Sequence, residues 1–147
     1  MRLLVSACLL GAGCRYDGKS NALPQLDRLL DRHTCVPVCP EQLGGLPTPR
    51  IPAERRGNRV IDREGKDVTA AFRRGAEEAV RMARLCGCRA ALLKERSPSC
   101  GCGQIYDGTF TGTLKAGDGL AAQALKKAGL TIYGESRAEE LLQDQNR

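Results

Sequence analysis

The sequence predicts an α/β fold in which a short, mostly parallel sheet is covered by helices on both faces. Short apolar runs, typical of buried strands, alternate along the chain with longer segments whose apolar residues recur at helical spacing. Strands that alternate with helices form parallel pairs with right-handed crossovers. The 147 residues are expected to form one domain, spanning 1–147, that buries its core without disulfides or metal ions as staples.

Four short segments are predicted as strands. The run LLVSA at 3–7 is apolar and ends in small residues, as expected of a buried parallel strand that leads into a loop. The β-branched run CVPVCP at 35–40 is a second strand, although Pro37 lacks the N–H that an interior strand residue donates. The segments RAALLKE at 89–95 and LTIYG at 130–134 are the third and fourth strands.

Four longer segments are predicted as helices, because their apolar residues recur at intervals of three and four positions. They cover residues 23–33, 67–87, 119–129 and 136–145. Asn21 is expected to cap the first helix, Asp67 or Thr69 the second, and Ser136 the fourth. Glycines close the second and third helices. Residues 41–66 hold glycine, proline and charge with little periodicity, so they are predicted as a long loop that is functional or mobile.

The net charge of +6 leaves three kinds of partner open: nucleic acid, a phosphorylated small molecule, or solvent alone. The basic residues are spread along the chain without a run of five, which favours a solvated surface. Aromatic residues make up 3% of the chain and tryptophan is absent, so a stacking platform for single-stranded nucleic acid is not expected. No segment approaches the roughly 18 apolar residues of a membrane span. We expect neither a membrane partner nor a stable nucleic-acid complex.

Eight cysteines in a chain of this size would suit a secreted disulfide framework, so the N-terminal residues bear on the compartment. The stretch MRLLVSACLLGAGC resembles a lipoprotein signal with cleavage before Cys14. Its single basic residue, its short apolar run and the immediate return of polar sequence argue against that interpretation. We therefore expect a cytoplasmic protein whose thiols stay reduced for metal binding or catalysis.

Three cysteines follow the predicted strands. Cys8 lies just past the first strand, Cys39 closes the second, and Cys100 lies a few residues past the third. Because the carboxyl ends of parallel strands share one edge of a sheet, we expect these three thiols to converge there. Thiolates are the ligands that zinc and iron–sulfur clusters select, and three protein ligands leave one position open for chemistry. For any single cysteine the alternative is a buried small hydrophobe.

The other cysteines give weaker signals. Cys102 lies two residues after Cys100 and stays open as a fourth ligand. Glycines follow each of the three converging thiols, where larger side chains would crowd a metal cluster. The remaining thiols are expected to pack in the core or to be incidental: Cys14, Cys35, Cys86 and Cys88.

Several short motifs carry a resemblance to a known family. They are, in order, VSACLLG, RYDG, PVCPEQLGGLPTPRIPAE, DVTAAF, LLKERSPSCG, IYDGTF and GDG. This series resembles the small bacterial and archaeal domain-of-unknown-function family 523, which includes the thiouracil desulfidases. The match runs from Arg2 to about Gly134, nearly the whole chain.

The resemblance implies a Rossmann-like domain, a three-layer sandwich that carries a 4Fe-4S cluster on three cysteines. By its motifs the cluster ligands are Cys8, Cys39 and Cys100, and one iron is left open for substrate sulfur. The implied activity is removal of sulfur, as sulfide, from a thiolated pyrimidine such as thiouracil. Water attacks the thiocarbonyl carbon, and the hydrolysis involves no net redox change.

Such chemistry needs a Lewis acid and a group that moves protons. Glu41, two residues after the second ligand, is predicted as that catalytic group, with a helix cap as the alternative role. Ser99, next to the third ligand, is predicted to relay a proton or to hold the substrate carbonyl, with a turn cap as the alternative. Asp17 and Asp107, both in Tyr-Asp-Gly, are expected to fix turns.

Four basic residues in or beside the motifs are predicted to bind the substrate: Arg15, Arg50, Lys94 and Arg96. Their charge favours a nucleotide such as 4-thiouridine monophosphate over the free base, and solvated surface charge is the alternative. A function of another class also stays open. In it the chain is a non-catalytic metal-binding module, with zinc or an iron–sulfur cluster in a structural or sensing role.

Overall fold

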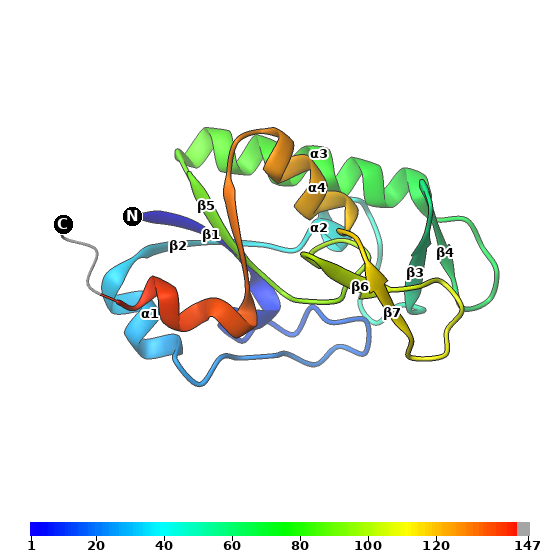
Figure 1. Ribbon diagram of the computed structural model, residues 1–147, viewed down its shortest axis with the longest axis horizontal. Coiled ribbons are helices and arrows are strands. Elements are labelled where there is room, and N and C mark those ends of the chain that lie inside the picture. Colours follow the sequence, from blue (N-terminus) through cyan, green and yellow to red (C-terminus); the bar gives the residue numbers. More distant parts are fainter. Residues whose placement is uncertain (144–147) are drawn as a thin grey trace.

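A four-stranded parallel sheet forms the centre of the molecule. The computed structural model describes residues 1–143 (Figure 1). The strand order is β2-β1-β5-β8, and every neighbouring pair is parallel. The strands are β1 at Arg2–Ser6, β2 at Thr34–Val38, β5 at Ala90–Leu93 and β8 at Thr131–Gly134. All four predicted strands are confirmed, and the signal-like N-terminal run forms the interior strand β1. Pro37 is tolerated because β2 lies at an edge of the sheet.

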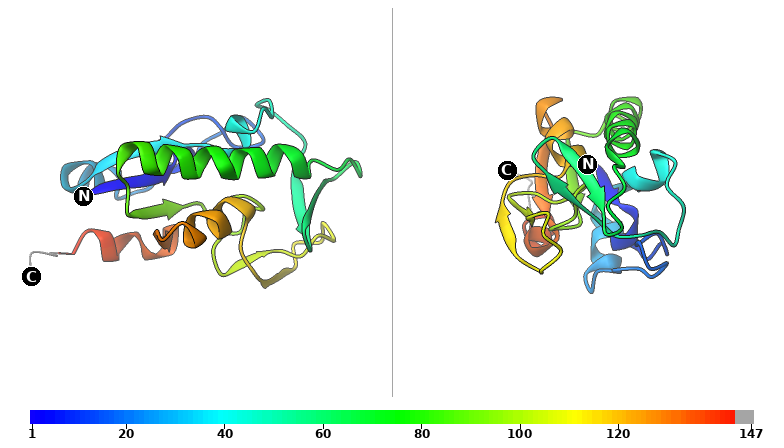
Figure 2. Two further views of the ribbon diagram at one scale, coloured as in Figure 1. Left: turned by 90° about the horizontal axis from the view of Figure 1, so that it is seen from above. Right: turned by 90° about the vertical axis from the view of Figure 1, so that its right-hand side faces the viewer.

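Helices cover both faces of the sheet, which confirms the predicted three-layer α/β architecture. On one face α3 at Thr69–Cys86 and α4 at Leu120–Lys127 pack over Leu4, Ala91 and Leu93. On the other face α1 at Leu26–Arg32 and the 3-10 helix η2 at Glu135–Leu141 pack over Leu3 and Leu92. The end-on view in Figure 2 shows the two pairs on opposite sides of the sheet. Alternate residues of β1 and β5 therefore enter two separate cores, as the pleat of a strand requires.

The helix boundaries differ in detail from the prediction. Helix α1 has no side-chain cap, so the expected capping role of Asn21 is wrong. Val68 is the N-cap residue of α3, and the Asp67 carboxylate accepts a hydrogen bond from the Thr69 N–H at 2.9 Å. The terminal segment winds as the 3-10 helix η2 from Glu135, and positions 144–145 of the predicted helix lie outside the described residues. In the part of the chain that the structure describes, no helix has the length and apolar character needed to span a membrane.

The predicted long loop at 41–66 contains regular structure, which corrects that expectation. Its first residues belong to α2 at Pro40–Leu43, and the hairpin of β3 at Ala53–Arg56 and β4 at Arg59–Asp62 follows. The buried positions of β4 are Val60 and Asp62, so one of the two carries charge, and the one buried residue of β3 is Glu54. The hydrophobic pattern that reveals a strand was therefore missing.

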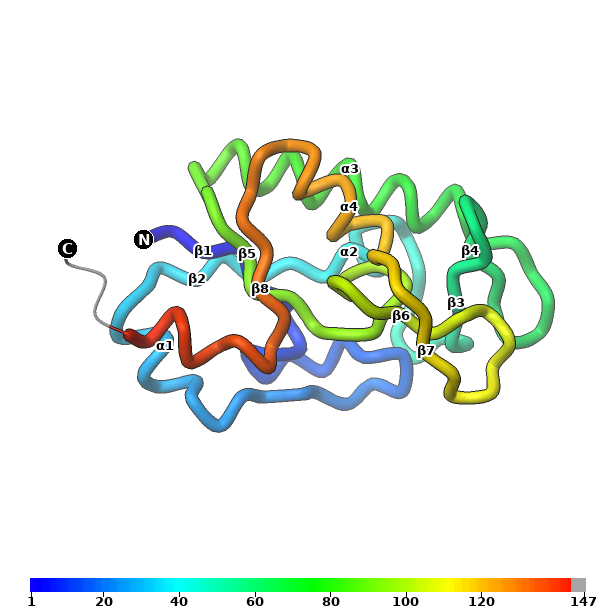
Figure 3. Tube along the Cα trace, viewed as in Figure 1, coloured from blue at the N-terminus to red at the C-terminus, as the bar shows by residue number. Residues whose placement is uncertain are grey.

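A second hairpin, also missed in the sequence, pairs β6 at Gln104–Tyr106 with β7 at Leu114–Ala116. The Cα trace in Figure 3 shows both hairpins beyond the carboxyl end of the central sheet. The Glu54 carboxylate of β3 joins them by accepting a hydrogen bond from Gly108 N–H at 2.9 Å. The short 3-10 helix η1 at Ala7–Leu10 leads out of β1 on the same side. This end of the molecule is thus closed by small elements rather than by loose loops.

Helix α2 lies against α3 with almost no space between the two backbones. A Cβ atom added at Gly75 would overlap the carbonyl oxygen of Pro40, and one added at Gly44 would overlap the carbonyl oxygen of Ala71. Both glycines have ordinary negative φ, so it is the missing side chain that matters at each position. The contact fixes the position of α2 and of Cys39, the residue that begins it.

We predict that Gly75→Ala destabilises the fold by about 2–4 kcal/mol, because α2 must move away from α3 to admit the methyl group. Helix propensity alone predicts the opposite sign, a gain of roughly 1 kcal/mol for alanine over glycine inside a helix. Urea unfolding followed by circular dichroism measures the difference, with the exposed neighbour Arg74→Ala as the control. A Gly75→Ala variant as stable as the parent protein would show that the two helices are not locked together.

Candidate active site

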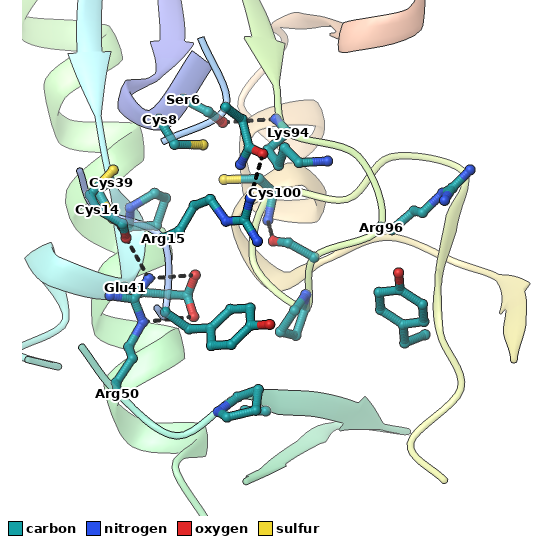
Figure 4. A pocket seen from close by; sticks show the side chains of 18 of the residues that line it. Ser6, Cys8, Cys14, Arg15, Cys39, Glu41, Arg50, Lys94, Arg96 and Cys100 are labelled. Atoms are coloured by element: carbon teal, nitrogen blue, oxygen red, sulfur yellow. Dashed lines mark hydrogen bonds and ion pairs between the residues drawn. The ribbon is translucent and has the colours of Figure 1, made fainter. Parts of the chain in front are cut away.

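The carboxyl ends of β1, β2 and β5 open into a cavity of about 510 Å³ (Figure 4). Ser6 and Cys8 reach it from the end of β1, and Val38 and Cys39 reach it from the end of β2. The opposite wall is made by residues of the two hairpins, among them Glu54. The cavity therefore occupies the place where parallel α/β sheets bind their ligands.

The three cysteines selected from the sequence all line this cavity. Cys8 lies in η1, Cys39 is the N-cap residue of α2, and Cys100 lies in the turn after β5. Figure 4 shows them on three separate segments around the opening. Cys8 and Cys100 are buried, whereas Cys39 is half-buried. The predicted convergence of three thiols at one edge of the sheet is thus present in the fold.

Burial disfavours the thiolate form of two of these thiols, those of Cys8 and Cys100. It raises the pKa of Cys100 to about 12, although a hydrogen bond with Ser6 acts in the opposite direction. Burial also raises the pKa of Cys8, and a hydrogen bond with Asn21 partly offsets this effect. A metal centre needs thiolates, so its insertion would displace protons from this pocket.

The spacing of the thiols does not suit a single metal ion. Within residues 1–143, no group of three or more His, Cys, Asp or Glu side chains lies close enough together to hold one. Zinc–sulfur bonds of roughly 2.3 Å bring the sulfurs of a tetrahedral site to within about 4 Å of one another. In an iron–sulfur cluster each cysteine binds a different iron atom, so the thiols stand farther apart. Thiol chemistry alone suits both groups, which differ in the sulfur–sulfur distances that they require.

Two further cysteines require comment. Cys14 lines the cavity as well, and its carbonyl oxygen accepts a weak hydrogen bond from the Cys39 thiol at 3.9 Å. Burial, reinforced by the neighbouring Cys39 and Cys8, raises the pKa of Cys14 to about 12. Cys14 packs in the hydrophobic cluster on the α1 and η2 face of the sheet, as expected, and it also borders the cavity. Cys102 does not line the cavity and packs at the α3–α4 side of the sheet, so its position does not support a fourth ligand.

The Glu41 carboxylate lines the cavity and is held by one arginine. Arg50 lies 3.4 Å from both carboxylate oxygens, through Nε and Nη2, and donates to the Cys14 carbonyl oxygen at 2.8 Å. It also donates to Thr48 Oγ1 at 2.9 Å, and its side chain is only 6% exposed. Its guanidinium is occupied by protein groups, so Arg50 is better placed to position Glu41 than to bind a substrate phosphate.

Ser97, rather than Ser99, is the serine that faces the cavity. Ser97 Oγ accepts hydrogen bonds from the backbone N–H groups of Ser99 at 3.0 Å and Cys100 at 2.7 Å, so it caps the turn that presents Cys100. The Ser99 side chain is 1% exposed, does not line the cavity and has an Oγ without a partner among the described residues. The predicted catalytic and capping roles of Ser99 thus gain no support from its position. Both serines are candidates in the sequence, and only the geometry of the turn shows which one lines the cavity.

The other predicted substrate-binding residues differ in how free they are. Arg15 pairs with Asp17 at 3.1 Å, and Lys94 pairs with Glu135 at 2.7 Å. Arg96 lines the cavity with an exposed side chain, and within residues 1–143 its guanidinium has no hydrogen-bond or ion-pair partner. The structure therefore leaves Arg96 as the most available of the four predicted cations.

Two of the glycines beside the thiols allow close approaches of the backbone. A Cβ atom at Gly101 would lie 2.6 Å from the carbonyl oxygen of Ser97 and 2.7 Å from Ile105, and one at Gly44 would meet α3. At Gly45 the added atom would meet nothing within 4 Å. The expectation that these glycines make space for a cluster stays a prediction.

Asp17 and Asp107 fix turns, as predicted. Asp17 Oδ1 accepts a hydrogen bond from the Lys19 N–H at 3.0 Å, and Asp107 Oδ1 accepts one from the Thr109 N–H at 3.0 Å. Asp107 belongs to the tip of the β6–β7 hairpin, and Asp17 lies in the segment between η1 and α1. Both carboxylates are thus used locally.

Comparison with known proteins places these features in one family. The model of a family described as 2-thiouracil desulfurase matches residues 3–137. The uncharacterized protein YbbK of Bacillus subtilis (strain 168) is 39% identical over 150 residues, which cover 95% of this chain and 99% of that protein. A solved structure described as a 4Fe-4S-dependent thiouracil desulfidase is 48% identical and covers 95% of this chain and 94% of its own, with a TM-score of 0.90.

We predict that Ser97→Ala and Ser99→Ala differ in their effect on stability. Loss of the Ser97 cap is expected to lower the free energy of unfolding by about 1 kcal/mol. Removal of the buried, unpartnered hydroxyl of Ser99 is expected to change it by less than about 0.5 kcal/mol or to raise it. Urea unfolding of the two variants in parallel makes the comparison. Equal destabilisation by both would mean that the Ser99 hydroxyl has a partner in solution.

Proposed function

This chain belongs to the 2-thiouracil desulfurase family, and we propose that it is a 4Fe-4S-dependent desulfidase that removes sulfur, as sulfide, from a thiolated pyrimidine. The observation that carries the proposal is the convergence of Cys8, Cys39 and Cys100 on one cavity at the carboxyl edge of the sheet. The same fold, at 48% identity, is that of a protein described as a 4Fe-4S-dependent thiouracil desulfidase. Loss of a thiocarbonyl sulfur by hydrolysis consumes one water, yields a carbonyl and sulfide, and needs no electron donor.

We assign Cys8, Cys39 and Cys100 as the cluster ligands. Their thiols line a shared cavity, and a protein of the same fold at 48% identity is described as 4Fe-4S-dependent. With three protein ligands, the bound cluster would supply an iron atom open to substrate sulfur, a Lewis acid that polarises the C=S bond. Cys14 is the rival thiol in the cavity, and its exclusion from the ligand set belongs to the proposal.

Glu41 is proposed as the group that moves the proton. Its carboxylate lines the cavity, and Arg50 fixes it through two contacts of 3.4 Å. From that position it can take a proton from the water that attacks the thiocarbonyl carbon. Ser97 replaces Ser99 as the serine placed to hold the substrate carbonyl, because of these two serines only Ser97 lines the cavity.

A nucleotide such as 4-thiouridine monophosphate is proposed as a substrate alongside the free base. Arg96 is the cation that supports it, since its guanidinium lines the cavity without a protein partner among the described residues. An unpaired arginine at a cavity can bind a phosphate through two parallel hydrogen bonds. Arg15 and Lys94 already neutralise carboxylates at 3.1 Å and 2.7 Å, so they are expected to contribute less.

We also propose a cytoplasmic location, because all eight cysteines are free thiols and the proposed cluster needs a reducing compartment. The rival function is a structural or sensing module that binds zinc or an iron–sulfur cluster, and the family match favours the desulfidase over it. Anaerobic purification followed by iron, zinc and sulfide analysis tests the choice. About four iron atoms per chain and sulfide release from thiouracil or 4-thiouridine monophosphate support the desulfidase. Stoichiometric zinc without iron would reject it.

We predict that Cys8→Ser, Cys39→Ser and Cys100→Ser each abolish cluster loading, because a serine hydroxyl does not replace a thiolate as a soft ligand. Cys102→Ser, which lies outside the cavity, is the matched control and is expected to keep full iron content. Iron analysis and the visible absorption of anaerobically reconstituted protein give the readout. Full loading after substitution of any of the three would remove that residue from the ligand set.

We predict that Glu41→Gln retains its iron but loses sulfide release by about 10²–10⁴-fold, because the amide cannot accept the proton from water. The amide oxygen can still accept from Arg50, so the fold is expected to persist. The control is Glu64→Gln at an exposed position outside the cavity. Turnover of the Gln variant at the parental rate would reduce Glu41 to a structural partner of Arg50.

A further inference from the structure

Aromatic side chains are concentrated at the cavity. The chain has three tyrosines, two phenylalanines and no tryptophan. Tyr16, Tyr106 and Phe110 line the cavity, whereas Phe72 is buried in the core and Tyr133 lies 4.8 Å beneath the Arg137 guanidinium. The chain has too few aromatic rings to stack a strand of bases. Most of the rings that it does have nevertheless lie at this one cavity.

Phe110 is held there in an unfavourable backbone conformation. Within residues 1–143, two residues other than glycine have a left-handed φ, Arg96 at 73° and Phe110 at 58°, and both line the cavity. This conformation is unfavourable for a residue with a side chain, and it is rare for a bulky one. Such strain persists where the surroundings impose it, and it gathers at functional sites.

A buried carboxylate next to Phe110 imposes the left-handed backbone conformation of this residue. Glu54 Oε1 accepts hydrogen bonds from the Gly108 N–H at 2.9 Å and from the Phe110 N–H at 3.1 Å, and the Glu54 side chain is 9% exposed. Arg56 Nε donates to the Gly108 carbonyl oxygen at 2.7 Å. The tip of the β6–β7 hairpin is thus docked on β3 by charge-assisted hydrogen bonds, which are among the stronger ones in proteins.

The Phe110 ring is not part of the hydrophobic core. Neither of the two hydrophobic clusters on the faces of the sheet includes it, and the residue is half-buried. The Arg63 guanidinium lies 5.8 Å from the ring centroid, so the cation stands against one face of the ring. Phe110 and Arg63 both line the cavity, so both side chains border a ligand that is held there.

We propose that Phe110 stacks on the heterocycle of the substrate and makes this site selective for planar aromatic thiocarbonyl compounds. The proposal rests on the function proposed above and adds the residue that recognises the ring. Phe110 binds the ring, and Arg96 binds a phosphate when one is present. The cysteines bind neither of these two groups. Stacking on a protein ring contributes about 5- to 150-fold to the affinity for a base.

The test measures binding of uracil and UMP, the sulfur-free products, to anaerobically prepared cluster-loaded protein by isothermal titration calorimetry. Phe110→Ala and Phe110→Leu are both expected to weaken binding of the two compounds by about 5- to 150-fold, whereas Phe110→Tyr restores it. The leucine variant keeps apolar volume without a π face. Arg96→Gln is expected to weaken UMP alone. Thr111→Ala, an exposed change in the same hairpin tip, is the control and leaves both affinities unchanged.

Each outcome of these measurements either supports or overturns the stacking role of Phe110. Parental affinity in Phe110→Ala or Phe110→Leu, or no measurable affinity of the parent protein for uracil and UMP, would overturn the stacking role. Iron content per chain and circular dichroism identify a misfolded alanine variant, in which case the Leu and Tyr variants carry the comparison. Binding that depends on Phe110 in a protein that releases no sulfide would keep this inference and reject the proposed function. If the protein releases sulfide but its affinity for uracil and UMP does not depend on Phe110, the proposed function stands and the stacking role is rejected.

Discussion

Every part of the site depends on three parallel strands that end at the same edge of the sheet. Ser6 at the end of β1 is opposite Val38 at the end of β2, and Val5 is opposite Leu92 of β5. With that register, thiols that are 31 and 61 residues apart in the sequence open into one cavity. The Gly44 and Gly75 contact between α2 and α3 then fixes the second of these strand ends. A shift of any one strand would disperse the donor set.

The charges around the cavity are arranged in pairs, and this leaves a small number of groups available for chemistry. Glu41 with Arg50, Arg15 with Asp17 and Lys94 with Glu135 neutralise one another. Burial opposes the thiolate form of Cys8 and Cys100 and so raises the pKa of each. Arg63 and Arg96 also line the cavity, and within residues 1–143 neither guanidinium has a hydrogen-bond or ion-pair partner. These two arginines leave positive charge available to an anionic ligand. The arrangement suits a metal cluster that replaces protons and a substrate that brings its own negative charge.

The sequence predicts the parts of the fold that follow hydrophobic periodicity, and it fails where polar residues form the structure. The four strands and α3 have clear patterns, whereas β3, β4, β6 and β7 are held by residues such as Glu54 and Arg56 that leave no apolar signature. The convergence of Cys8, Cys39 and Cys100 could be predicted because it depends only on where the strands end. The sequence does not distinguish Ser97 from Ser99, because the geometry of one turn decides which hydroxyl faces the cavity. The position of Cys14 at the cavity was not predicted, because Cys14 follows η1, an element without a hydrophobic pattern.

The central claim is that three cysteines hold a cluster whose fourth iron carries no protein ligand. A crystal structure of the protein purified and crystallised without oxygen tests it most directly, with anomalous scattering collected at the iron edge. The account predicts a four-iron cluster bonded to the Sγ atoms of Cys8, Cys39 and Cys100, with Cys14 Sγ unbonded to metal. Density for a single ion, or a bond from Cys14 to the fourth iron, would contradict it.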